Sequence, residues 1–171
     1  MGGFGQTLTA SDGNRVLVDV VATRLVFTNQ PQGSVSGQVL TAQPVVAALN
    51  DAGYIDRDFS EAITLSLSQG GGQLVNFVVA AINGVATFTN VTYVASADKE
   101  SVVVGANDED GIGTNLPSVL ANAFISDVVA TQLLFSTQPS GSVSGQALTT
   151  QPVLVAQDGL GMVDIDFSDI V

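Results

Sequence analysis

One long segment of the chain occurs twice, and this repeat limits the possible folds more than any other feature. The segment "DVVATRLVF", which begins at Asp19, returns as "DVVATQLLF" at Asp127, an offset of 127 − 19 = 108 in the numbering. Residues 19–63 align with residues 127–171 without a gap, and 26 of the 45 aligned positions are identical. Solenoid repeats have about 20–50 residues, whereas a period of 108 has the size of an independent domain. We therefore expect tandem domains, each with its own hydrophobic core.

The repeat predicts one complete domain and two partial ones. Residues 1–18 are expected to be the C-terminal strand of a preceding repeat, because "GFGQTL" at positions 3–8 matches "GIGTNL" at positions 111–116, at the same offset. Residues 19–126 are predicted to form a complete domain, and residues 127–171 the N-terminal part of a second one. This organisation favours a fragment of a longer array. The alternatives are subunits that complete each other by strand addition and a loosely ordered tail.

The local patterns within the period are those of β-strands. In "ITLSLS" (63–68), apolar and polar residues alternate, as in a strand with one buried face. "TRLVFT" (23–28) and its copy "TQLLFS" (131–136) end just before Gln-Pro, where proline prevents further ladder pairing. Asn83-Gly84 predicts a tight hairpin turn within residues 74–93, because both turn positions need positive φ. Further strands are expected at 44–49, 100–106 and 118–126.

Composition and strand count together predict an all-β fold of the immunoglobulin-like sandwich type. Apolar residues make up 46% of the chain, but aromatic residues only 6%, and the chain has 18 glycines. Small residues and many valines suit thin sandwiches better than helical bundles. We reject helices at 44–51 and 118–131, since both are short and rich in β-branched residues. About seven short strands per period fit this sandwich.

At this point the chain resembles a known family. "LVFTNQP", "QPVV", "NDAGYIDRDF" and "NGVATF" are similar to motifs of bacterial Ig-like domains, which occur in tandem in large surface adhesins and other giant secreted proteins. The resemblance covers residues 19–126 once and residues 127–171 in part. It implies an Ig-like fold and a spacer role. Family members often carry a tyrosine in the strand after "NGVATF", and "ESVVVGA" (100–106) has none.

Charge and residue types exclude several classes of function. Sixteen acidic residues oppose four basic ones, giving a net charge of −12, which argues against nucleic acid because binding its phosphates requires Lys and Arg. It equally disfavours anionic membrane surfaces, and no apolar run approaches the roughly 20 residues that span a bilayer. The absence of His and Cys removes the usual general bases and thiol nucleophiles. Lys99, between two acids, is interpreted as a solvated charge. We therefore expect no enzyme activity.

Acidic residues in the turns are the candidate site. Hard oxygen ligands without His or Cys point to Ca²⁺, although Asp and Asn are also ordinary turn formers, so solvated acidic loops remain the alternative. The candidate ligands lie in two loops expected at one pole of the complete domain, and in the second copy with its linker. They are Asp51, Asp56 and Asp58; Asp108, Glu109 and Asp110; and Asp127, Asp158, Asp164 and Asp166.

Two functions are compatible with these features. The first is a non-enzymatic structural or adhesion repeat, a spacer in a long bacterial surface or secreted protein. In such a spacer, Ca²⁺ bound by the acidic residues of the second copy and its linker, next to the loop of Asp98 and Glu100, would stiffen the joint between domains. The second is a self-assembling subunit of an extracellular filament, sheath or surface layer. The expected partners are neighbouring repeats or identical subunits. The location would be the cell exterior, with the export signal outside this segment.

Overall fold

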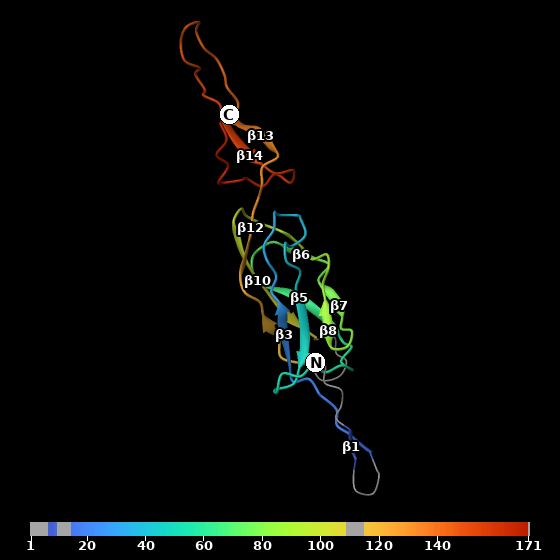
Figure 1. Ribbon diagram of the computed structural model, residues 1–171. Helices are drawn as coiled ribbons and strands as arrows, with labels where there is room; N and C mark the ends of the chain where they lie inside the picture. Colours follow the sequence, from blue (N-terminus) through green and yellow to red (C-terminus); the bar gives the residue numbers. More distant parts are fainter. Residues whose placement is uncertain (1–6, 10–14, 109–114, 171) are drawn as a thin grey trace.

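The computed structural model describes residues 7–9, 15–108 and 115–170, with side chains from residue 18 onwards. In this part of the chain, all regular secondary structure is β-strand, which confirms the predicted all-β class. No helix among the described residues is long and apolar enough to cross a membrane. Figure 1 shows an elongated molecule, with the β1 region at one end, a larger body in the middle and β13–β14 at the other end.

The body of the molecule consists of antiparallel sheets formed by residues 19–126. One sheet has the order β3-β4-β8, and the other has the order β11-β10-β5-β7, with β12 also paired to β10. A separate pair joins β6 and β9. The strands are β3 (Arg24–Asn29), β4 (Val45–Leu49), β5 (Ala62–Gln69), β6 (Gln73–Val75), β7 (Val78–Ala80), β8 (Val85–Thr87), β9 (Thr92–Val94), β10 (Glu100–Asn107), β11 (Val119–Leu120) and β12 (Phe124–Ser126).

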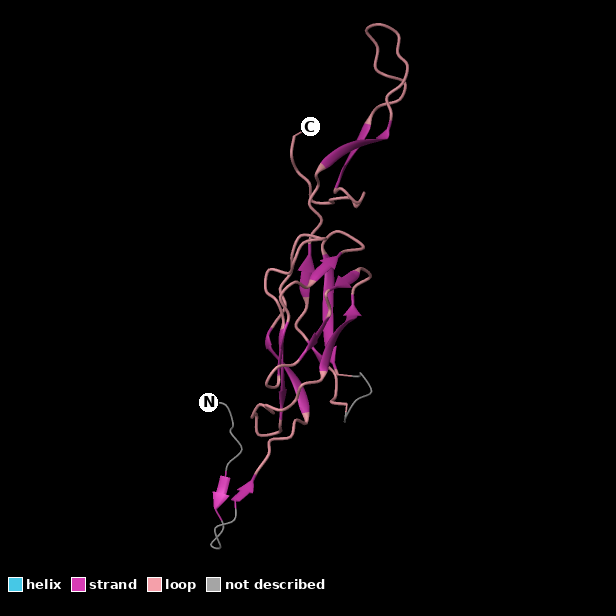
Figure 2. Cartoon of the chain, turned by 90° about the vertical axis from the view of Figure 1, so that its right-hand side faces the viewer, coloured by secondary structure: helices cyan, strands magenta, loops and turns pink. Residues whose placement is uncertain are grey.

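The apolar faces of these sheets enclose one core. Leu25 and Phe27 alternate along β3 with more exposed neighbours, and Ile63 and Leu65 do the same along β5. Burying one such side chain stabilises the fold by about 1.5–3 kcal/mol. Figure 2 shows these strands running mainly along the long axis of the body, in an arrangement consistent with a β-sandwich. The largest fully buried side chains of this core are those of Tyr93, Phe88, Ile63, Leu65, Val46, Val91, Val102 and Val104.

The predicted turn at Asn83-Gly84 is confirmed, whereas one of the predicted strands is wrong. Asn83 and Gly84 have φ values of 52° and 78°, and the flanking Ile82 and Val85 form an antiparallel bridge, as the predicted turn requires. Beyond this bridge, β7 pairs with β5 and β8 pairs with β4, so the turn also connects the two sheets. The single strand expected at 118–126 is divided into β11 and β12, both of which pair with β10. The body therefore has more strands than the seven expected.

The second copy contributes an antiparallel pair, β13 (Gln132–Thr137) and β14 (Val153–Gln157). Its pairing is irregular between Phe135 and Thr137, just as the β3–β4 pairing is irregular between Phe27 and Asn29. The surroundings differ, however. Phe27 is 7% exposed, whereas Phe135 is 47% exposed. The β13–β14 pair therefore presents an apolar face that no described residue covers to the extent seen in the body.

The N-terminal part forms a third antiparallel pair, β1 (Thr7–Thr9) with β2 (Arg15–Leu17). Leu8 is paired with Val16 in this register. Residues 1–18 remain, as a prediction from the repeat, the end of a preceding domain.

Candidate functional site

The connection between the two copies is anchored to the first one. The Asp127 amide donates to Ser34 O at 3.0 Å, and the Ser36 amide donates to Asp127 O at 2.7 Å. Val128, the next residue, has no exposed surface. The chain therefore leaves the body as a fixed strand-like segment, and this places the side chain of Asp127 beside the turn that joins β9 to β10.

Asp98, in that turn, ties three parts of the chain together. Its Oδ1 accepts hydrogen bonds from the amides of Val128 and Lys99, each at 2.8 Å, and its Oδ2 accepts one from the amide of Ile165 at 2.9 Å. Desolvation acts to raise the pKa of Asp98, but these main-chain donors outweigh it and hold the pKa below its ordinary value. The carboxylate thereby joins the body, the linker and the loop after β14.

Lys99 reaches the second copy with its side chain. Its ammonium lies 2.7 Å from Asp127 Oδ1 and 2.9 Å from Asp166 Oδ2. Hydrogen bonding to Asp127 first, and then to Asp166, raises the pKa of Lys99, while the Lys99 ammonium lowers the pKa of Asp166. The backbone φ of Lys99 is 53°, a left-handed conformation that is uncommon for residues other than Gly, Asn and Asp. Lys99 is therefore an exposed charge, as expected, but it is paired with two carboxylates of the second copy and its linker.

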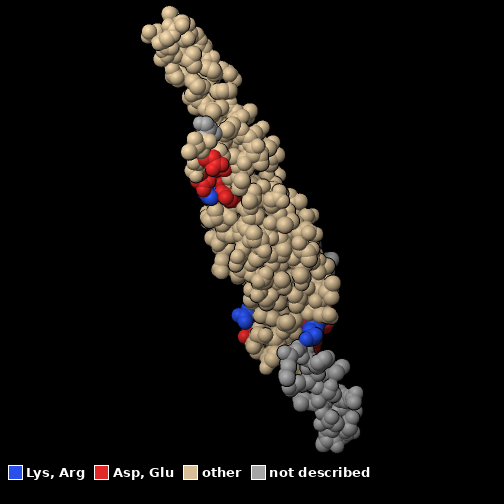
Figure 3. Space-filling view, turned by 45° about the horizontal axis from the view of Figure 1, so that its top comes forward, with Lys and Arg blue, Asp and Glu red and all other residues tan. Residues whose placement is uncertain are grey.

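Three carboxylates meet at this joint. Asp98, Asp164 and Asp166 each offer an oxygen within 4.8 Å of the others, and Figure 3 shows acidic side chains gathered beside a basic one in this part of the molecule. Asp164 Oδ2 accepts from the Ala130 amide at 2.9 Å, while its Oδ1 is buried and accepts no hydrogen bond among the described residues. The group is close enough to hold a metal ion, and carboxylate oxygens suit a hard cation.

The predicted ligands in the first copy accept hydrogen bonds from donors of the same copy. Asp51 accepts from Thr23 Oγ1 at 2.7 Å, and buried Asp56 accepts from the Ala22 and Phe59 amides at 2.8 and 3.2 Å. Both oxygens of fully buried Asp108 accept from the Leu116 amide, at 2.9 and 3.1 Å. Among the described residues, Asp51, Asp56, Asp58 and Asp108 do not form a group of three oxygens close enough for one ion. Glu109 and Asp110 lie outside the described residues.

Asp56 and Asp58 affect one another. Desolvation raises the pKa of Asp56, but hydrogen bonds from Asp58 and from main-chain amides lower it overall. The pKa of Asp58 is raised, first by its interaction with Asp56 and further by the charges of Asp56 and Asp19. This cluster therefore carries like charges that repel one another.

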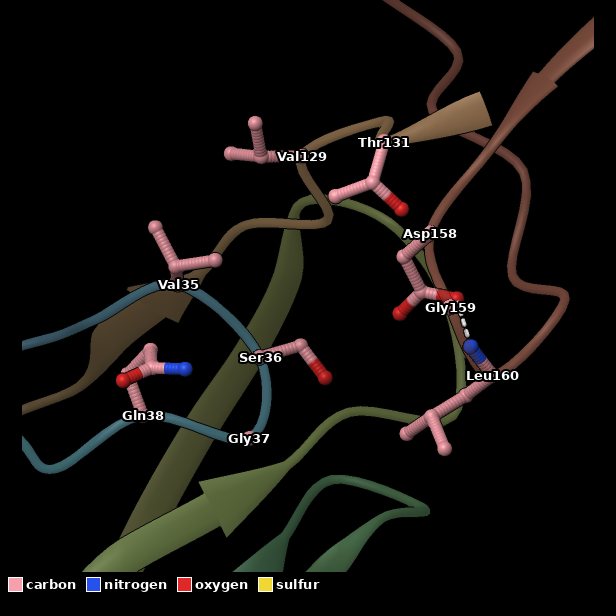
Figure 4. A pocket seen from close by; sticks show the side chains of 9 residues that line it. All are labelled: Val35, Ser36, Gly37, Gln38, Val129, Thr131, Asp158, Gly159 and Leu160. Carbon is pink, nitrogen blue, oxygen red and sulfur yellow. Dashed lines mark hydrogen bonds between the residues drawn. The ribbon is translucent and has the colours of Figure 1, made fainter. Parts of the chain in front are cut away.

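Asp158, another predicted ligand, closes its own loop. Its Oδ1 accepts from the amides of Leu160 at 2.9 Å and Met162 at 2.8 Å. Asn50 Oδ1 accepts from the Tyr54 amide in the corresponding loop of the first copy. Asp158 also borders a hollow of about 260 Å³ between the two copies, which Figure 4 shows with the loops 35–38 and 158–160 on its walls. Asp158 is not part of the joint's group of three carboxylates.

Sequence reasoning placed the loop of Asp98 and Glu100 next to the acidic residues of the second copy but did not identify Lys99 as a contact of that copy. It also missed the role of Glu100, whose carboxylate accepts from Tyr93 Oη at 2.9 Å and from the amide and hydroxyl of Ser96, each at 2.8 Å. The adjacent opposite charges of Asp98 and Lys99 in one turn were the sequence signal that could have indicated the contact of Lys99 with the second copy.

Comparison with known proteins gives no assignment. No protein-family model matches the chain, and no curated protein is significantly similar to it.

Proposed function

We propose that this chain is a non-enzymatic part of an extracellular structural or adhesion array of bacterial type, built from Ig-like repeats with a period of 108. One observation carries the proposal: the hydrogen bonds of the first copy recur in the second at the same offset. The Ala22 amide donates to Asp56 Oδ2 at 2.8 Å, and the Ala130 amide donates to Asp164 Oδ2 at 2.9 Å. Such recurrence is expected of successive domains that begin with the same strands.

Main-chain contacts support the same equivalence. Thr23 donates to Leu49 O at 2.8 Å, and Thr131 donates to Gln157 O at 2.8 Å. The β3–β4 and β13–β14 registers also correspond residue by residue. A joint tied by Asp98 and Lys99 suits a spacer, because it restricts bending between neighbouring domains. The net charge of −12 favours solubility and separation of neighbouring arrays.

Solution measurements on the purified chain test this function. An array segment is expected to stay monomeric over a wide concentration range in analytical ultracentrifugation and to give an elongated particle in small-angle X-ray scattering. Hydrogen exchange should show residues 19–126 opening as one cooperative unit. Regular fibres, or cooperative opening of both copies together, would contradict the array.

Calcium at the joint is part of the proposal. Asp98, Asp164 and Asp166 would supply one oxygen each, and the Oδ1 of Asp164 is buried without a hydrogen-bond partner among the described residues. Saturating Ca²⁺ at about 100 times the dissociation constant would stabilise the bound state by about 2.7 kcal/mol. Thermal melting with Ca²⁺ and with excess chelator tests this, with Asp164→Asn as the variant and Asp169→Asn as the control. An unchanged midpoint for the natural chain argues against calcium.

A second candidate function is a self-assembling subunit of an extracellular filament, sheath or surface layer, joined by strand complementation. The exposed apolar face of the second copy favours it: Leu133 is 42% exposed, whereas its counterpart Leu25 is 3% exposed. β14 also lacks, among the described residues, the strand that β8 provides for β4. Electron microscopy that shows regular fibres, lost in the variant Leu133→Ser, would favour this function over the array.

A further inference from the structure

We propose that Asp19, Asp56 and Asp58, the first acidic cluster, form a docking surface for the lysine-bearing turn of a preceding repeat. The contact would reproduce the one that Lys99 makes with the second acidic cluster, which consists of Asp127, Asp164 and Asp166. This inference rests on the array function proposed above and identifies the partner surface of each repeat.

The two clusters occupy equivalent positions. Asp19, Asp56 and Asp58 correspond to Asp127, Asp164 and Asp166, each at the repeat offset of 108. Their local frames agree as well: the Asp56 amide donates to Ala48 O at 3.1 Å, and the Asp164 amide donates to Ala156 O at 3.0 Å. What the second cluster binds in this structure therefore indicates what the first cluster is built to bind.

The second acidic cluster is occupied by a specific turn. Lys99 contacts Asp127 and Asp166 with its ammonium, and Asp98 accepts from the amides of Val128 and Ile165. The residues equivalent to these two donors in the first copy are Val20 and Arg57. Position 57 carries arginine where position 165 carries isoleucine. Because the donors are main-chain amides, this difference in side chain leaves the donor in place.

The pKa shifts of the equivalent residues Asp166 and Asp58 have opposite directions, as expected if a lysine is bound at the second cluster and absent from the first. At the second cluster, Lys99 lowers the pKa of Asp166. At the first cluster, Asp56 and Asp19 raise the pKa of the equivalent Asp58. A lysine placed beside Asp58 and Asp19 would relieve this repulsion, as an opposite charge within a few ångströms favours the charged carboxylate.

The occupant is the turn of another repeat. Lys99 is the only lysine of the chain, and it is already paired with Asp127 and Asp166, so a second copy of this chain would have to break its own joint to supply it. The two surfaces are different, so the contact is head-to-tail and repeats without closing.

A longer chain provides the test: residues 1–126 followed by residues 19–171, so that a second complete repeat precedes the present joint. Zero-length carbodiimide coupling joins an ammonium to a carboxylate that it touches, and mass spectrometry identifies the linked residues. In the original chain, we expect Lys99 to be coupled to Asp127 or Asp166. In the longer chain, we expect a second link of comparable yield, from the leading Lys99 to Asp19 or Asp58 of the following repeat.

Matched variants make the result specific. Lys99→Met in the leading repeat should abolish the new link and leave the original one, and Asp19→Asn with Asp58→Asn in the following repeat should do the same. If the original link forms and the new one does not, the inference is overturned. Small-angle scattering separates this from failure of the array: a longer rod without the new link leaves the array intact, whereas a compact or fibrous longer chain refutes the array itself.

Discussion

Tyr93 and Glu100 are joined by a hydrogen bond of 2.9 Å from the phenol hydroxyl to Oε2, at the base of the turn that carries Asp98 and Lys99. Tyr93 is fully buried, and its oxygen also accepts from the Gly72 amide at 2.9 Å. Desolvation and the bond to Glu100 raise the pKa of Tyr93 to about 12. The joint turn is thus attached to the core of the first copy.

Tyr93→Phe should destabilise the first copy. The change removes a hydrogen bond to a charged group and leaves the Gly72 amide without its acceptor, so the free energy of unfolding should fall by about 1.5–3 kcal/mol. Urea unfolding measures the loss. Tyr54→Phe is the control, because Tyr54 is 56% exposed and should change the stability little. Equal effects of the two variants would contradict the role of Tyr93.

Stability should depend on pH through Glu100. Desolvation acts to raise the pKa of this carboxyl, but donors from Gly71, Ser96 and Tyr93 lower it from 4.5 to about 2. Because the folded pKa is the lower one, the contribution is complete above about pH 4.5 and is lost as the pH falls towards 2. Unfolding of the natural chain and of Glu100→Gln across this window should therefore give converging stabilities at low pH. A constant difference between the two would refute the prediction.

Asp98→Ala should loosen the joint and leave the core intact. The change removes the acceptor of the Val128 and Ile165 amides, so hydrogen exchange at the Ile165 amide should become faster. Asp169→Ala is the control, and the unfolding midpoint of the body should stay nearly constant. Unchanged exchange at Ile165 would show that Asp98 does not hold the second copy.

The ion pairs of Lys99 should matter for the joint more than for stability. Both partners are partly exposed, and such pairs contribute at most about 1 kcal/mol. Lys99→Met should therefore change the unfolding midpoint little but broaden the distribution of distances between spin labels in the two copies. Salt at about 1 M, where the Debye length is about 3 Å, should act in the same direction on the natural chain. A distribution insensitive to both changes would contradict this.

Phe27 and Phe135 occupy equivalent sequence positions but should respond differently to truncation. Phe27 is 7% exposed, within the core, and Phe27→Ala should cost about 3–5 kcal/mol. Phe135 is 47% exposed, so Phe135→Ala should cost much less. Denaturant unfolding of both variants compares them directly. Similar losses would show that the second copy is covered in solution, as strand complementation requires.

The strands were predictable from the sequence because their signal is local. Alternation of apolar and polar residues in 63–68 identified β5, and the strands expected at 44–49 and 100–106 correspond to β4 and β10. The positive φ values at Asn83 and Gly84 also followed from residue type. The pairing of β7 with β5 and of β8 with β4 did not follow, because core packing selects the partner of each strand.

The candidate site was likewise predictable from the sequence only in part. The sequence by itself determined that the turns are acidic, that a sequence segment repeats with a period of 108, and which carboxylates stand at equivalent positions. The tertiary structure alone decided that Asp98 binds the amide of Ile165, 67 residues away, and that Lys99 lies between Asp127 and Asp166. The physical reason is that the charge of a turn follows directly from its residue types. The groups that the turn contacts depend instead on how two separately paired sets of strands are placed end to end.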